Sequence, residues 1–116
     1  MLYAILCYHD EAEVGSWPKE KDDAVLAKRA VVTQKLAAQG KLGPVARLMP
    51  TTAATTVRSG REPWIIDGPF AETKELVAGY WLWEVRSMDD ALAWLRRAPF
   101  DAGTYEIRQI FDREGM

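Results

Sequence analysis

Apolar residues along this chain fall into short runs, which are typical of strands, and into one longer stretch with helical spacing. Residues 1–9, MLYAILCYH, are apolar and aromatic and too short for most helices, so they predict a buried strand. After Pro18, apolar residues recur at helical spacing as far as Gly40, which suits the left-handed residue that often follows a helix. We therefore expect a strand followed by a long helix of about 20 residues.

The middle of the chain has the character of strands interrupted by prolines. Gly43, Pro44 and Pro50 bracket a short apolar segment, which favours an edge strand or a bulged strand. Residues 51–58 are rich in β-branched residues, the stretch SGREP predicts a turn, and residues 63–66 resume an extended course. The sequence thus predicts a hairpin between these last two segments.

The last third of the chain predicts strand, helix and strand. Residues 75–85, ELVAGYWLWEV, form the strongest predicted strand, in which Gly79 indicates a bulge or a close approach by another group. Ser87 and Asp90 stand at capping-box spacing, and the helix that they open should end before Pro99. Its inner stripe is predicted to contain Met88, Ala91, Leu92 and Leu95. Residues 103–111 alternate as in a strand with one wetter face.

The order of these elements predicts an α+β fold. Short connections and right-handed crossovers reduce it to a ferredoxin-like βαββαβ sandwich, an antiparallel sheet with both helices on one side. At 116 residues, with 48% apolar and 28% charged residues, the chain is of ordinary size and composition for one domain. We therefore treat residues 1–116 as a single domain.

Both faces of the strongest strand are apolar, although the helices would cover only one of them. One face would carry Leu76, Ala78, Tyr80 and Leu82, and the other Val77, Trp81, Trp83 and Val85. A sheet with one solvated face should instead alternate apolar and polar residues. We expect a second copy of the chain to cover the bare face and form a homodimer; the alternative is a cavity lined by aromatic residues that takes a small-molecule ligand.

Charge and composition exclude several classes of protein. The net charge of -2 gives no broad basic field, which argues against nucleic acid as a partner. No stretch approaches the roughly 18 apolar residues of a membrane span, and the N-terminus lacks signal-peptide features, so we expect a soluble cytoplasmic protein. Cys7 stands alone inside an apolar run, where a buried inert thiol is expected rather than a nucleophile.

Residues 67–75, DGPFAETKE, crowd charge directly before the aromatic strand. Asp67 with the following Gly-Pro suits a turn; alternatively, partial burial at the mouth of a cavity would raise the pKa of Asp67 and make it a general base. Glu72 would then share proton transfer, and Lys74 would orient an anionic group. The alternative for these charges is a solvated, self-paired cluster.

Three further residues are candidates for a site. His9 ends the first predicted strand and titrates near neutrality, but no second His or Cys stands at ligand spacing, so we expect no metal. Arg29 is either a snorkelling stem or a cation at the edge of a pocket. Tyr80 belongs first to the core or the dimer interface and second to a pocket lining. The sequence contains no P-loop, no dinucleotide-binding fingerprint and no Ser, His and Asp in the order of a catalytic triad. We therefore expect no cofactor.

The stretch DGPFAETKE resembles the signature of the YCII-related family, also called the DGPF-domain family. YAILCYHDE, GPVARLMPTTAATTVR and GYWLWEVRSMDDALAWLRRAP match as well, so the resemblance covers essentially the whole chain. It implies a ferredoxin-like chain that pairs into a dimeric α+β barrel. Some members resemble small lyases or isomerases of ring compounds, and DGPF members are often associated with extracytoplasmic-function sigma factors. Other YCII-like proteins carry a His and Asp pair with the His on the first helix; this long helix has none, so that pair is not carried over.

The sequence thus supports two hypotheses of function. The first is a small cofactor-independent enzyme that performs lyase or isomerase acid/base chemistry on a small carbonyl or ring compound. The catalytic candidates are Asp67, Glu72 and His9, and the substrate-binding candidates are Lys74, Arg29 and Tyr80. The rival is a non-catalytic dimeric module that binds a ligand or a protein, such as an extracytoplasmic-function sigma factor.

Overall fold

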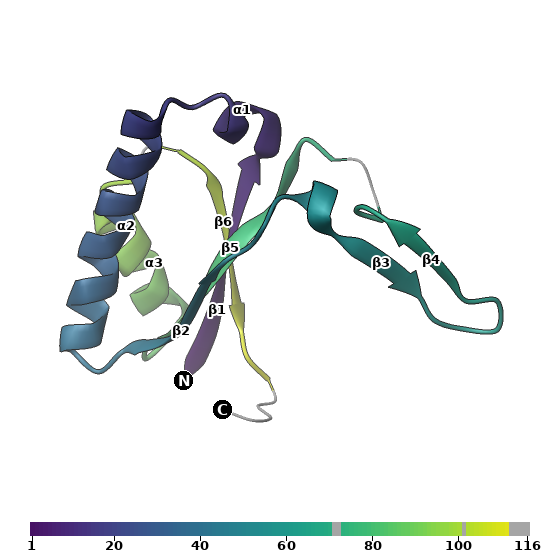
Figure 1. The fold of residues 1–116 in the computed structure, drawn as a ribbon. Coiled ribbons are helices and arrows are strands. Elements are labelled where there is room, and N and C mark those ends of the chain that lie inside the picture. The colour runs from purple at the N-terminus through teal and green to yellow at the C-terminus, as the bar shows by residue number, and fades with distance from the viewer. Residues whose placement is uncertain (71–72, 101, 112–116) are drawn as a thin grey trace.

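One antiparallel sheet of four strands forms the centre of the molecule (Figure 1). The computed structural model describes residues 1–70, 73–100 and 102–111. The strands are β1 (Leu2–Asp10), β2 (Leu42–Arg47), β5 (Glu75–Glu84) and β6 (Thr104–Gln109). They lie in the order β2-β5-β1-β6, and every neighbouring pair is antiparallel. This mixed α+β architecture is compatible with the predicted ferredoxin-like arrangement.

Two long helices cover one face of the sheet. They are α2 (Lys19–Ala38) and α3 (Met88–Arg97), and they lie on the same side of the strands in Figure 1. Gly40 follows α2 with a φ of 69°, and the Ser87 hydroxyl accepts a hydrogen bond of 3.1 Å from the Asp90 amide at the start of α3. Both predicted helices and both of these end signals are therefore confirmed. In the part of the chain that the structure describes, no helix is long and apolar enough to cross a membrane.

The hydrophobic core lies between these helices and the sheet. Its buried members come from the sheet and both long helices: Tyr3, Ile5, Cys7, Val32, Leu36, Trp81, Trp83, Val85, Ala91 and Trp94. On α3, Trp94 faces this core, whereas Met88, which the predicted inner stripe contained, is 40% exposed. The prediction for Met88 was wrong because an amphipathic helix can rotate by part of a turn until its largest apolar side chain is covered.

A bulge in β5 changes which side chains face the core. Cys7 of β1 lies opposite Gly79, but Tyr8 lies opposite Val77, so β5 carries one extra residue, Ala78. A Cβ atom at Gly79 would lie 2.5 Å from the Ala46 carbonyl oxygen, which explains the glycine. Since a one-residue shift exchanges the faces, the predicted alternation was wrong on the N-terminal side of Gly79, and Val77 shares the open face with Tyr8.

The hairpin of β3 (Thr55–Arg58) and β4 (Trp64–Asp67) projects from the sheet on the side opposite the long helices (Figure 1). Its antiparallel pairing confirms the predicted hairpin, although residues 51–53 form a short 3-10 helix, η1 (Thr51–Ala53). The Cα radius of gyration is 16.0 Å, against about 13 Å for a compact chain of this length. The projecting hairpin accounts for the difference.

Candidate functional site

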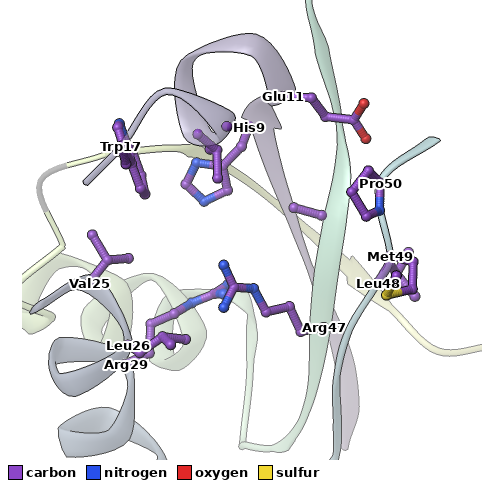
Figure 2. A pocket seen from close by; sticks show the side chains of 13 residues that line it. His9, Glu11, Trp17, Val25, Leu26, Arg29, Arg47, Leu48, Met49 and Pro50 are labelled. Carbon is purple, nitrogen blue, oxygen red and sulfur yellow. The ribbon is translucent and has the colours of Figure 1, made fainter. Parts of the chain in front are cut away.

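A cavity of about 440 Å³ lies beside the C-terminal end of β1, between α1 (Glu11–Gly15), α2 and the segment after β2 (Figure 2). Sites for small molecules typically have volumes of about 300–1,000 Å³. Apolar side chains form much of the wall: Val14, Val25, Leu26, Leu48, Met49 and Pro50. The titratable side chains in the lining are His9, Glu11, Arg29 and Arg47. The cavity is therefore of ligand size and mainly apolar, and few of its lining side chains are charged.

His9 is held firmly in this cavity. It lies on the helix-covered face of β1, opposite Leu76 of β5, and is only 8% exposed. Its ring and that of Trp17 form a T-shaped pair, with ring centres 5.9 Å apart and planes at 85°. A Cβ atom at Gly103 would lie 2.8 Å from Cε1 of His9, so the glycine leaves room for the imidazole. The ring is thus confined between Trp17 and Gly103.

The surroundings of His9 lower the pKa of its imidazole below the ordinary value of 6.5. Burial is the largest cause, because it disfavours the charged ring, and the nearby guanidinium groups of Arg29 and Arg47 add to the effect. Glu13 and Glu75 act in the opposite direction and offset part of the decrease. His9 is therefore neutral at pH 7 and can accept a proton.

This pKa shift makes stability depend on pH. We expect the free energy of unfolding to fall as the pH drops below about 6.5, because the unfolded chain then binds a proton that folded His9 resists. The decrease should stop below the lowered pKa of the folded imidazole. Urea unfolding between about pH 5 and 8 measures it, with His9→Gln as the control that lacks the imidazole. An identical pH dependence in the two proteins would contradict the assignment.

Arg29 reaches the same cavity from α2. Its guanidinium carbon lies 5.0 Å from the centre of the Trp81 ring, in cation–π contact. Its Nε atom is buried and has no hydrogen-bond partner within the described residues, and none of their carboxylates forms an ion pair with it. Near it, Cys7 is fully buried, as predicted, and burial raises the pKa of its thiol, while the charge of Arg29 acts in the opposite direction.

The other charged residues of the cavity are engaged by neighbours. Nη2 of Arg47 lies 2.9 Å from Oδ1 of Asp22 on α2. The two carboxylate oxygens of Glu11 accept hydrogen bonds from the backbone N–H and the hydroxyl of Thr51, at 2.8 and 2.7 Å. Glu11 thereby ties α1 to η1, and its carboxylate does not neutralise the arginines.

The structure brings some of the sequence candidates together and separates others. His9 and Arg29 line the same cavity, and His9 shares a second, more polar hollow with Lys74. Tyr80 lies opposite Leu6 and contributes to a neighbouring hollow that also touches Arg29. Arg29 and Lys74 thus each share a hollow with His9, while Glu72 lies outside the described residues.

Asp67 lies apart, at the end of the projecting hairpin strand β4. It is exposed, pairs with Thr55, and does not belong to the lining of the His9 cavity. Gly68 follows with a φ of 101°, and its N–H donates a hydrogen bond of 2.6 Å to the Ala54 carbonyl. The backbone at Gly68 thus closes this end of the hairpin.

Sequence reasoning missed α1 and two residues of the cavity. Asp10 caps α1, because its Oδ1 accepts hydrogen bonds from the Ala12 and Glu13 amides at 3.0 and 3.3 Å. An acidic cap with Glu13 three residues later was the available signal. Trp17 and Arg47 gave no local signal, since only the packing of α1 and β2 around His9 brings them to the site.

The donor groups do not form an evident metal centre. In the ranges 1–70, 73–100 and 102–111, no group of three or more His, Cys, Asp or Glu side chains is arranged to hold a metal ion. The titratable side chains that line the cavity are one imidazole, two guanidinium groups and one carboxylate, set among apolar side chains.

Fold and cavity together define a small α+β protein with one buried histidine and two arginines in a cavity of ligand size. Residues 1–114 match the family described as the YCII-related domain, and the chain belongs to this family. It is 48% identical over 114 residues to an uncharacterised protein of Rhizobium meliloti (strain 1021), a match that covers 95% of this chain and 92% of the relative. The resemblance carried by DGPFAETKE is confirmed.

Proposed function

We propose that this protein is a small cofactor-independent enzyme that performs acid/base chemistry of the lyase or isomerase type on a small carbonyl or ring compound. The observation that carries the proposal is His9, which is 8% exposed, lines a cavity of about 440 Å³, and has a lowered pKa. A general base works best when it is unprotonated at working pH and confined within reach of its substrate. His9 meets both conditions.

In the proposed reaction, His9 removes a proton from the carbon next to the substrate carbonyl. The C–H bond breaks, its electron pair forms an enolate, and the imidazole becomes protonated; the arginine charges stabilise the developing oxyanion. His9 also lines the second hollow, together with Asp10, Glu13 and Lys74, which offers the proton a polar route to solvent. Return of a proton to another carbon gives isomerisation, and loss of a leaving group gives elimination.

His9 takes the role of base in this proposal in place of Asp67. The carboxylate of Asp67 stands on the projecting hairpin and is not part of the cavity of its own chain. Lys74, in the second hollow, remains a candidate for an anionic group of the substrate. The proposal therefore rests on the residues that surround one cavity.

Exchange of carbon-bound hydrogen in D₂O tests the proposal without knowledge of the natural substrate. Small carbonyl and ring compounds are incubated with the protein, and the loss of the α-proton signal is followed by NMR. At least one compound that binds should exchange faster than in buffer alone. Binding without any exchange across the panel would favour the rival function, a non-catalytic binding module.

We also propose that the protein forms a homodimer through the open sheet face, as in a dimeric α+β barrel. Apolar side chains on the face opposite α2 and α3 remain half-buried in the single chain: Ala4, Leu6, Tyr8, Val77 and Tyr80. On the projecting hairpin, Val57 and Ile65 are 59% and 69% exposed. An isolated two-stranded hairpin is marginally stable in water, so both surfaces favour a second copy that covers them.

Sedimentation velocity checks the dimer. The wild-type chain of 13.1 kDa is expected to sediment at twice its mass at about 10 µM, and Leu6→Asp, which places a charge on the open face, is expected to sediment as a monomer. Ala24→Asp on the exposed surface of α2 is the matched control and should remain dimeric. A wild-type monomer at this concentration would contradict the proposal.

A further inference from the structure

We infer that the His9 cavity recognises the carboxylate of a small organic acid, with Arg29 as its principal ligand and Arg47 as a second cation. The substrate class of the proposed enzyme is then a carbonyl compound that carries a carboxylate. The reaction of such a compound rests on the proposed function, whereas its binding does not.

The charge balance of Arg29 is the first argument. Arg29 is half-buried, and a guanidinium group that is partly removed from water without a counter-ion loses part of its solvation free energy. Arg29 recovers part of this through the Trp81 ring, but its buried Nε has no partner within the described residues. An anion in the cavity would supply both the missing charge and the missing hydrogen-bond acceptor.

The second argument is the convergence of cations. Arg47 extends from β2 toward Arg29, which comes from α2, and His9 lies beside them (Figure 2). The Arg47 side chain is 48% exposed and shares its charge with Asp22. The only carboxylate in the lining, that of Glu11, points away toward Pro50 and is occupied by Thr51. Within this lining, two guanidinium groups therefore accompany a single carboxylate, which is hydrogen-bonded to Thr51.

The shape and polarity of the cavity favour a carboxylate on an apolar body. A planar carboxylate matches the planar fork of a guanidinium group, with which it forms two parallel hydrogen bonds. The wall also contains aliphatic residues such as Val25, Leu26 and Leu48, which offer an apolar surface to a hydrocarbon chain or ring. A small monocarboxylic acid satisfies both parts of the cavity.

Such an anion would also change His9. The charged groups that act on the imidazole are Arg29 from α2, Arg47 from β2, Glu13 from α1 and Glu75 from β5. An anion beside the two arginines offsets their repulsion of a protonated imidazole, so it raises the pKa of His9. Binding would thereby make His9 a stronger base at the moment when a substrate is present.

Benzoate and its neutral analogue benzamide test the inference, with binding followed by tryptophan fluorescence. Wild type should bind benzoate at least about tenfold more tightly than benzamide, since one charge-assisted hydrogen-bond pair contributes about 1.5–3 kcal/mol. Arg29→Met should abolish this preference, and Arg29→Lys should retain part of it. Arg96→Met on the exposed end of α3 is the matched control and should bind as wild type does.

NMR provides a second readout, because His9 is the only histidine of the chain and its imidazole resonances are unambiguous. Saturating benzoate should raise the pKa of His9, whereas the same concentration of sodium chloride should not. Equal binding of benzoate and benzamide, or wild-type benzoate affinity in folded Arg29→Met, would overturn the inference.

The two proposals can fail separately. Arg29-dependent benzoate binding without hydrogen exchange in any bound carbonyl compound would leave the carboxylate site intact and refute the proposed reaction. Exchange that is equally fast in carbonyl compounds with and without a carboxylate would support His9 as a base and refute the inferred substrate class.

Discussion

In a His9→Gln variant, we expect exchange of the substrate's α-proton to fall by about 10²–10⁴-fold, the usual contribution of a general base. Glutamine is polar and of similar size, but its amide cannot accept a proton at neutral pH. The measurement is the initial rate of signal loss in D₂O, for a carbonyl compound that exchanges with wild type. Because Arg29 remains in place, binding of benzoate should change little.

Arg96→Gln, on the exposed end of α3 and outside the linings of both hollows, provides the control. Its exchange rate should stay close to that of wild type. If His9→Gln exchanged as fast as wild type, the base would lie elsewhere, and Asp67 of a second copy would become the next candidate.

The largest expected loss of stability comes from Trp83→Ala. Trp83 is fully buried and packs on Trp81 with ring centres 5.5 Å apart, so its truncation leaves a large cavity in the core. We expect the free energy of unfolding to fall by about 3–5 kcal/mol, as measured by urea unfolding. The reference value is that of the wild-type protein under the same dimeric or monomeric conditions.

Trp83→Phe is the matched variant for this prediction. It keeps most of the aromatic volume and removes an indole N–H that is buried without a partner in the described part of the chain. Its free energy of unfolding should fall by well below half as much as that of Trp83→Ala. Equal losses in the two variants would show that the aromatic volume kept by phenylalanine does not account for the contribution of Trp83.

Local signals were sufficient for most of the fold. The Ser87-capped helix has an apolar stripe and end signals within a few residues. The long helix buries only Val32 and Leu36 but is bounded by Pro18 and Gly40, and both helices formed as predicted. The hairpin was predictable from turn chemistry. The strand order then followed from short connections and crossover handedness, because few arrangements of these elements satisfy both.

The site was only partly predictable, because it depends on packing between distant segments. His9 and Arg29 were candidates by residue type, but nothing near them in the chain indicates that Trp17 and Arg47 complete the same cavity. The conspicuous DGPF stretch identified the family correctly, yet it places Asp67 on the hairpin and outside that cavity. The signature therefore indicated the family more reliably than it indicated the position of the candidate site.

The extra residue in β5 connects the lining of the cavity with the pairing of the strands. Ala78, the residue for which β1 has no counterpart, is itself part of the cavity lining. On the N-terminal side of Ala78, Leu76 lies on the same face of the sheet as His9, and Val77 lies on the opposite face. Removal of Ala78 would restore regular pairing between β1 and β5 and would also change which side chains line the cavity. A one-residue deletion in β5 would thus change the lining of the cavity without any change to the arginines or the histidine.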